Sequence, residues 1–368
     1  MLSSLLEQGL LACPACRRVE AGVFRDAPLA MVSVAESRGG RPWQGQLACT
    51  GCGSRYPIVD GVPVILKDVA GWVRDQERSL MWRDDLDPGL EGWLRASWTE
   101  HQDPNWKREL LATYARDLAP VGGGDGVFPS SLQDQQRATR SFLLERQRER
   151  LAAVGPDALA VDLGAGVGAQ ALAMAGLGAR SIALEREFGP LRLLSRLLTE
   201  GRVTVPRWRH GGSDFLSVAL ELPANVDPQR VLPIAADALD PPFRGGRLPL
   251  VTAYNLLDNV GDPVVLLRQA HALLSPGGAL VLASPYDWTD RCTPIALRLG
   301  ASIRVGADDE PDPAQALRDL LVGRLPALAP GVSMEILHER QELPWLLQRH
   351  GRSWHLFLSH YVEAVRSL

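Results

Sequence analysis

The chain has 368 residues, 46% of them hydrophobic, and its 39 Lys and Arg against 43 Asp and Glu leave a net charge of −4. This length predicts about two domains with a sizeable core. The slightly negative charge argues against nucleic acid or an anionic membrane as a partner. No apolar run approaches the roughly 20 residues that span a bilayer, so we expect a small molecule or a peptide.

Residues 1–66 predict a small β-rich domain that binds a metal. They hold four of the five cysteines, as two CxxC pairs separated by 32 residues. The four are Cys13, Cys16, Cys49 and Cys52. Two such pairs surround one ion tetrahedrally with thiolates, which predicts a structural Zn²⁺ site, and the span between them predicts a hairpin. A redox CxxC is the alternative, but neither pair opens a helix after a strand in a βαβ unit.

The segment LLACPAC and the later segment LACTGCGSRYPIVDGVPVIL, of which the second ends at Leu66, resemble the Trm112-type zinc ribbon. That resemblance implies a role in folding and docking, and leaves no open metal position for chemistry. Leu10 to Cys13 also have the form of a lipoprotein cleavage site, but Glu7 and Gln8 interrupt the stretch before it and it has no Lys or Arg. We therefore expect a cytoplasmic protein. Cys292, the remaining cysteine, is interpreted as an ordinary side chain.

Residues 67–150 predict a helical linker or cap that is rich in aromatic residues and broken by GGGDG at 122–126. Its tryptophans include Trp72, Trp82, Trp93, Trp98 and Trp106. These side chains either close over a pocket and exclude water or form ordinary core.

Residues 151–368 predict an α/β domain with a mostly parallel, seven-stranded sheet and helices on both faces, because short apolar strands alternate with helical patterns. The expected strands are 158–163, 180–185, 231–236, 248–254 and 279–284. The expected helices are 168–176, 188–200 and 263–274, the last closed by Pro276, Gly277 and Gly278. Two alternating stretches within 332–368 predict an antiparallel hairpin that completes the sheet.

The segment VDLGAGVG, residues 161–168, predicts a nucleotide-type cofactor site. Asp162 ends an apolar strand, and Gly164, Gly166 and Gly168 precede an Ala-rich helix. Glycines let the backbone approach a ligand closely, and the helix N-terminus offers free amides. By itself this pattern also fits the dinucleotide GxGxxA motif.

Polar residues at successive strand ends decide between these cofactors. Here the chain resembles class I methyltransferases over about residues 140–368, including the SPGG that precedes the strand ALVLASP. The resemblance implies that S-adenosylmethionine is the cofactor, with Asp162 at its methionine amino group, Glu185 at the ribose hydroxyls, and Asp237 with Ala238 at the adenine. The alternatives are a solvated strand end for Glu185 and a helix cap for Asp237.

The acceptor site is predicted where NLLDNVGDP follows the fourth strand and SPYDW follows the fifth, because catalytic groups gather at this edge of such sheets. Asn255 and Asp258 lie three residues apart and are expected on one side of a helical turn, with Tyr286 beside them. The alternative is that Asn255 and Asp258 cap the following helix.

NLLDNVGDP and SPYDWTDRCTP resemble the methyltransferase domain of ovothiol-forming sulfoxide synthases and, more distantly, the DREV-type protein-histidine methyltransferases. Both relatives methylate an imidazole nitrogen. The resemblance implies that Asp258 accepts the ring N–H while Asn255 and Tyr286 hold the ring edge, with Trp288, Arg349 and Arg352 as candidates for substrate binding. The two arginines equally suit a solvated strand end.

The sequence therefore predicts N-methylation of a small histidine-derived imidazole of thio- or selenohistidine type. Methylation of histidine in a protein or peptide, and a non-catalytic Trm112-like module that binds a partner, remain the alternatives.

Overall fold

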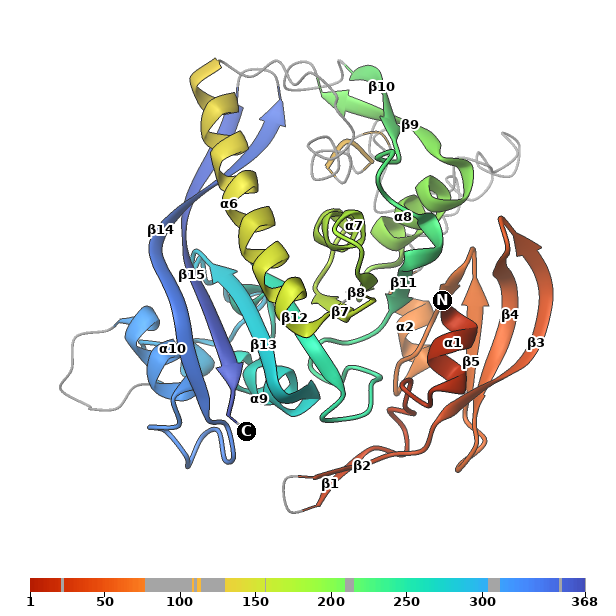
Figure 1. Cartoon of the computed structure of the whole chain (residues 1–368), viewed down its shortest axis with the longest axis horizontal. Coiled ribbons are helices and arrows are strands. Elements are labelled where there is room, and N and C mark those ends of the chain that lie inside the picture. Colours follow the sequence, from red (N-terminus) through yellow and green to blue (C-terminus); the bar gives the residue numbers. More distant parts are fainter. Residues whose placement is uncertain are drawn as a thin grey trace.

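The structure is a computed structural model that describes residues 1–20, 23–76, 108, 111–113, 130–155, 157–208, 215–303, 312–350 and 353–367. Its centre is a seven-stranded sheet in the order β11-β8-β7-β12-β13-β15-β14 (Figure 1). The first five strands pair in parallel, and β15 pairs antiparallel with β13 and β14. The strands are β7 (Leu159–Leu163), β8 (Arg180–Glu185), β11 (Val231–Ala235), β12 (Leu248–Tyr254), β13 (Leu274–Ser284), β14 (Met334–His350) and β15 (Ser353–Arg366). The mostly parallel, seven-stranded sheet predicted from the sequence is confirmed.

Helices cover both faces of this sheet, as predicted. On one face, α6 (Ser130–Val154), α7 (Ala169–Gly176) and α8 (Phe188–Glu200) pack against residues such as Ala160 and Ala183. On the other, α9 (Pro263–Leu273) and α10 (Pro313–Leu321) pack in a core that includes Val161 and Leu163. The alternation arises because neighbouring residues of a strand point to opposite faces.

One strand begins earlier than expected. The sequence predicts that Pro276, Gly277 and Gly278 close a helix before a strand at 279, but α9 ends at Leu273 and β13 starts at once. Leu274 pairs with Leu248, and the register then shifts before Ala279 pairs with Leu250. The Pro-Gly-Gly segment is therefore an irregular part of the strand and does not cap the helix.

Three described elements of residues 151–368, two strands and a helix, were not predicted. A two-stranded hairpin, β9 (Arg202–Trp208) with β10 (Phe215–Glu221), lies between α8 and β11. Helix α10 precedes β14, with Asp312 as its N-cap. Short 3₁₀ turns occupy η1 (Pro228–Arg230), η2 (Leu257–Asn259) and η3 (Ile295–Leu297).

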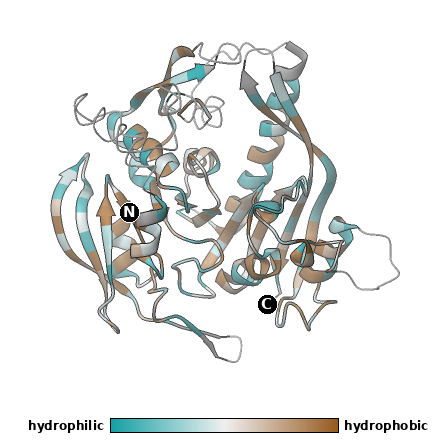
Figure 2. Ribbon diagram, turned by 180° about the vertical axis from the view of Figure 1, so that it is seen from behind, coloured by the Kyte–Doolittle hydropathy of each residue, from teal (hydrophilic) through white to brown (hydrophobic). Residues whose placement is uncertain are grey.

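The N-terminal domain contains a four-stranded antiparallel sheet in the order β3-β4-β5-β6 and a separate β1-β2 pair. Its elements are α1 (Leu2–Glu7), β1 (Arg18–Glu20), β2 (Val23–Arg25), β3 (Leu29–Arg38), β4 (Arg41–Cys49), β5 (Arg55–Val59), β6 (Val62–Pro63) and, just beyond, α2 (Val69–Asp75). The β3-β4 pair is the hairpin expected between the cysteine pairs. Hydrophobic and hydrophilic segments alternate along these strands (Figure 2).

The N-terminal domain continues the edge of the central sheet. Val64 forms a parallel bridge with Ala235 of β11, and the Ile65 N–H donates to the Ala235 carbonyl at 2.8 Å. A buried ion pair joins Asp60 to Arg192 of α8 at 2.9 Å. Leu2 and Leu5 of α1 also belong to the main core. The edge strand β11 is thereby covered, which removes an exposed set of backbone hydrogen-bonding groups.

The aromatic-rich region 67–150 is described only in part. Trp72 is buried in α2 and α6 begins at Ser130, whereas Trp82, Trp93, Trp98, Trp106 and the GGGDG break lie outside the described residues. Within the described ranges, no helix combines the length and apolar character needed to cross a membrane.

Candidate functional site

The glycine loop after β7 leaves open space beside its backbone. Gly164, Gly166 and Gly168 all have positive φ, at 67°, 52° and 80°. A Cβ at Gly164 would meet Leu256 at 2.5 Å and one at Gly168 would meet Leu194 at 2.5 Å, but a Cβ at Gly166 would meet no atom within 4 Å. At Gly164 and Gly168 a side chain would displace a leucine methyl group, whereas the room above Gly166 fits a ligand that lies against the backbone.

Asp162 lies inside β7 and is buried. Its Oδ1 accepts a hydrogen bond of 2.7 Å from Thr252 of β12, the strand beside it. Burial raises the pKa of Asp162 to about 7, the negative charge of Glu185 adds to the rise, and the Thr252 hydroxyl opposes it. A cation beside this carboxylate would favour its charged form, as the amino group of an amino-acid moiety does.

Glu185 ends β8 and is held by backbone on two sides. Its Oε2 accepts from the Gly166 N–H at 2.9 Å, and its Oε1 accepts from the N–H groups of Arg186 and Glu187 at 2.7 and 3.1 Å. Burial raises the pKa of Glu185 although these three donors stabilise the charged form. The carboxylate is therefore no freely solvated strand end; it is fixed against the glycine loop and retains acceptor capacity for hydroxyl groups.

Asp237 and Ala238 lie just beyond β11, which ends at Ala235. The Asp237 Oδ1 accepts from the Leu239 N–H at 2.8 Å, so it closes a turn, and Ala238 is buried. Because β7, β8 and β11 are parallel, their carboxyl ends bring Asp162, Glu185 and Asp237 to one edge of the sheet.

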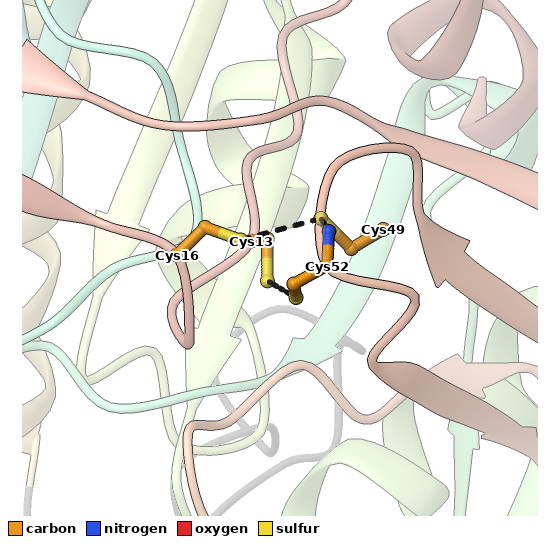
Figure 3. A group of neighbouring side chains, drawn as sticks. All are labelled: Cys13, Cys16, Cys49 and Cys52. Atoms are coloured by element: carbon orange, nitrogen blue, oxygen red, sulfur yellow. Dashed lines mark hydrogen bonds between the residues drawn. The ribbon is translucent and has the colours of Figure 1, made fainter.

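The four predicted metal ligands converge, as Figure 3 shows. Their sulfur atoms all lie within 4.8 Å of one another, with Cys13 and Cys52 at 3.8 Å and Cys16 and Cys49 at 3.6 Å. Four thiolates bound tetrahedrally to Zn²⁺ at about 2.3 Å would be separated by about 3.8 Å. The cluster therefore has the dimensions of a structural zinc site.

Further donors surround these sulfurs. The Cys49 Sγ accepts from the N–H groups of Gly51 and Cys52, both at 3.3 Å, and the Tyr56 hydroxyl lies 2.9 Å from the Cys13 Sγ. Donors of this kind stabilise thiolate charge around a metal.

On the acceptor side, Asn255 follows β12 in a left-handed conformation, with φ of 51°. Its N–H donates to the Ala283 carbonyl at 2.7 Å, and its Oδ1 accepts from the Ser359 hydroxyl at 3.2 Å. Asn255 does not cap α9; that helix is capped by Asp262, whose Oδ1 accepts from Val264 and Val265. The side chain of Asn255 is therefore held at the sheet edge by β15.

Asp258 is almost fully buried and joins the two predicted acceptor loops. Its Oδ2 accepts from the Asp287 N–H at 2.7 Å, and its Oδ1 lies 3.4 Å from the Asn259 amide nitrogen. Burial raises the pKa of Asp258, against the stabilising Asp287 N–H and Ser284 hydroxyl. Asn255 and Asp258 were expected to project together from one turn, but η2 gives them different partners.

Tyr286 follows β13 and also has positive φ, at 57°. This conformation is uncommon for a bulky side chain and marks local strain. Its N–H donates to Ser284 Oγ at 3.1 Å, its ring stacks on Trp288, and its hydroxyl lies 2.6 Å from the Nδ1 of His360. The side chain of Arg349 and the whole of Arg352 lie outside the described residues.

The sequence did not reveal the residues behind Tyr286. His360 of β15 contacts Glu339 of β14, which pairs with Arg318 of α10. These residues are separated by at least 20 positions, and no motif joins them. The signal that could have found them is a polar residue, His360, inside the apolar pattern of a predicted strand.

Residues 161–282 match the methyltransferase domain family, and residues 9–61 match the Trm112p-like protein family. The chain is an S-adenosylmethionine-dependent methyltransferase with an N-terminal Trm112p-like domain. The glycine loop, Asp162, Glu185 and the turn at Asp237 fit its cofactor, and the four cysteines fit a structural zinc ion. The dinucleotide alternative and the non-catalytic alternative are thereby set aside.

Solved structures also resemble this methyltransferase, at low identity. Magnesium protoporphyrin IX methyltransferase from Synechocystis PCC 6803 with bound cofactor is 15% identical, with 73% of this chain and 100% of that chain covered and a TM-score of 0.38. A methyltransferase from Methanococcus maripaludis is 13% identical, with 74% and 98% covered and a TM-score of 0.40. For phosphoethanolamine N-methyltransferase 2 from Haemonchus contortus, the values are 15% identity, 35% and 24% coverage, and 0.27. No curated protein matches the chain.

Proposed function

We propose that this methyltransferase methylates an imidazole ring nitrogen of a small histidine-derived molecule, of thio- or selenohistidine type. One observation carries the proposal. Two non-glycine residues with polar side chains, Asn255 and Tyr286, are held at positive φ at the carboxyl ends of the adjacent strands β12 and β13. For the bulky Tyr286 this conformation is strained, and such strain collects at functional sites. An amide beside a phenol suits the edge of a flat polar ring.

Bound S-adenosylmethionine supplies an electrophilic methyl group. On the chain's side, we propose that the glycine loop, Asp162, Glu185, Asp237 and Ala238 hold the cofactor, and that Asn255, Tyr286 and Trp288 hold the acceptor. An imidazole that gains a methyl group becomes cationic unless its other nitrogen loses a proton. Holding both reactants in line provides most of the acceleration, up to about 7 to 11 kcal/mol where alignment is good.

The contacts of Asp258 refine its proposed role. Both oxygens already accept within the protein, from Asp287 and Asn259, and the residue is 1% exposed. We propose that Asp258 ties the two acceptor loops together and that its negative charge favours a cationic ring, while Tyr286 meets the ring N–H. Arg349 and Arg352 remain proposed contacts for an acceptor carboxylate.

We also propose a reducing compartment such as the cytoplasm. Four cysteines kept as thiolates for zinc require reduced thiols, and none of the five forms a disulfide.

The test is an acceptor screen with methyl-labelled S-adenosylmethionine. Its arms are histidine, 5-thiohistidine, the selenium analogue, carnosine and His-containing peptides, with phosphoethanolamine and a phenol as acceptors that lack imidazole. Label on a small imidazole, lost in Tyr286→Phe, is the expected result. Label on peptides alone would favour a protein-histidine methyltransferase, and label on an acceptor without imidazole would contradict the proposal.

A further inference from the structure

A chain of four polar side chains runs from the proposed acceptor site through the buried ring of His360 to the partly exposed pair of Glu339 and Arg318. The Tyr286 hydroxyl lies 2.6 Å from His360 Nδ1, His360 Nε2 lies 2.7 Å from Glu339 Oε1, and Glu339 Oε1 lies 2.6 Å from Arg318 Nη1. The four residues come from the loop after β13 and from β15, β14 and α10. His360 is 2% exposed, so both of its ring nitrogens are used inside the protein.

The direction of each hydrogen bond follows from the ends of the chain. Glu339, paired with Arg318, is a carboxylate and can only accept. A neutral His360 therefore carries its proton on Nε2, which leaves Nδ1 without a proton and able only to accept. The Tyr286 hydroxyl must then donate to His360. Its oxygen has no proton left for another partner, so it can only accept a hydrogen bond from a bound molecule.

The charges around the ring support this protonation state. Burial lowers the pKa of His360, although Glu339 and Asp312 favour its cation, and Arg318 lowers that pKa further. Burial alone would raise the pKa of Glu339, but hydrogen bonds from Arg318 and His360 outweigh it and lower the value. Burial raises the pKa of Tyr286, so the phenol keeps its proton. The charges of Asp312, Glu339 and Asp258 add to this rise in pKa, and Arg318 opposes it.

We infer that His360, Glu339 and Arg318 are positioning residues that fix the Tyr286 oxygen as a hydrogen-bond acceptor, so that the site selects methyl acceptors that present an N–H beside the reacting nitrogen. This inference rests on the proposed function and names how that site recognises its substrate. The same arrangement of a carboxylate behind a histidine orients the hydroxyl of serine hydrolases, but here no proton leaves the tyrosine.

The inference predicts loss of activity in acid. A protonated His360 donates from both nitrogens, to Glu339 and to Tyr286, and the phenol must then turn its own proton toward the acceptor. The phenol proton and the acceptor N–H are then two donors facing each other, so no hydrogen bond forms between them. The acceptor imidazole must also be neutral to attack, so the acid limb of kcat/KM should contain the low pKa of His360 beside that of the acceptor. The His360 step should disappear in a variant that cannot be protonated at this position.

The first measurement needs no substrate. In protein labelled with ¹⁵N-histidine, the signal of His360 among the seven histidines is assigned with His360→Gln. We expect a neutral ring with its proton on Nε2 at pH 7.5, and a shifted signal in Tyr286→Phe and in Glu339→Gln. A ring protonated on Nδ1, or a cation at pH 7.5, would overturn the inference even if no imidazole acceptor is ever found.

The second measurement compares His360→Leu with His360→Gln, because a glutamine oxygen can accept from Tyr286 while its NH₂ group donates to Glu339. For the imidazole acceptor found in the screen, we expect His360→Leu to lower kcat/KM by about 10- to 100-fold. His360→Gln should restore most of it, with an acid limb that reports only the pKa of the acceptor. His271→Gln is the matched control, since burial also lowers the pKa of His271 and that residue lies in α9.

Two kinetic outcomes contradict a positioning role for His360. One is an acid limb that persists unchanged in His360→Gln. The other is equal loss in His360→Gln and His360→Leu with weaker cofactor binding, which marks a structural role. If wild-type protein methylates only acceptors without imidazole, the proposed function fails. The nitrogen signals of His360 still decide whether its hydrogen bonds to Tyr286 and Glu339 have the inferred directions.

Discussion

Glu185 and Asp237, on the β8 and β11 side of the sheet, accept hydrogen bonds from backbone groups no more than 19 residues away. On the side of β12 and β13, the partners lie 29 residues away for Asp258, 74 for Tyr286 and 104 for Asn255. The contacts of Glu185 and Asp237 on the proposed cofactor side are thus set by local turns. Asp162, bonded to Thr252 90 residues away, and the proposed acceptor side depend on strands brought together from distant parts of the chain.

The sides also differ in their support. The N-terminal domain and α2 contact the cofactor side, where Trp72 Nε1 donates to the Arg186 carbonyl at 2.8 Å and Gln76 accepts from the Phe188 N–H at 3.2 Å. Ile65 pairs with the end of the edge strand β11 on the same side. The acceptor side is supported by β14, β15 and α10.

Loss of zinc should give the largest effect, on the stability of the protein and on the proposed cofactor side. We expect Cys49→Ser, or removal of zinc by a chelator, to lower the free energy of unfolding by several kcal/mol, because structural zinc contributes directly to folding. S-adenosylmethionine affinity should fall with it. Metal analysis, thermal unfolding and calorimetry check this, and Cys292→Ser, outside the cluster, should retain one zinc ion. Full cofactor affinity in zinc-free protein would show that the N-terminal domain does not support this side.

Replacement of Asp258 by Ala should separate the two sides. We expect kcat/KM for the acceptor to fall by about 100- to 1,000-fold, because two loops lose their shared anchor, with cofactor affinity within about 3-fold of wild type. Asp290→Ala, in the same loop region but at an exposed ion pair, should have little effect. Equal losses for acceptor and cofactor would mean that Asp258 serves folding.

Glu185→Gln should have the opposite effect to Asp258→Ala, because it should weaken cofactor binding and leave the acceptor kinetics largely unchanged. A charge-assisted hydrogen bond contributes about 1.5 to 3 kcal/mol, so we expect S-adenosylmethionine to bind about 10- to 100-fold more weakly. Acceptor kinetics at saturating cofactor should change little. Glu200→Gln, which removes a carboxylate from the surface of the adjacent helix α8, is the control. A greater change in acceptor KM than in cofactor affinity would refute the assignment.

The smallest effect concerns pH. Burial raises the pKa of Asp162 to about 7, so the folded protein holds this proton more tightly than the unfolded chain. Its contribution to stability is present below the unfolded pKa of about 3.9 and is lost as pH rises through about 7. Between pH 5.5 and 7.5 the cofactor-free protein should lose about 2 kcal/mol. Urea unfolding measures this; Asp162→Asn should flatten the slope, and an unchanged slope would contradict the assignment.

The sequence alone predicted the sheet, its helices, the zinc cluster and the positions of Asp162, Glu185 and the glycine loop. These features depend on the period of apolar residues and on motifs shorter than ten residues, so neighbouring residues carry the information. The β9–β10 hairpin and α10 were missed because they join no motif.

Only the tertiary structure decided that the N-terminal domain pairs with the end of the edge strand β11 and that Asp258 accepts from the backbone of the SPYDW loop. It also decided that His360, Glu339 and Arg318 form a chain of hydrogen bonds to Tyr286. Each depends on strand order and register: His360 meets Tyr286 because it pairs opposite Ser284, and β14 then places Glu339 beside it. Side chains 74 residues apart become neighbours through the hydrogen bonds of a sheet, and one sequence without its pairing partners does not contain that register.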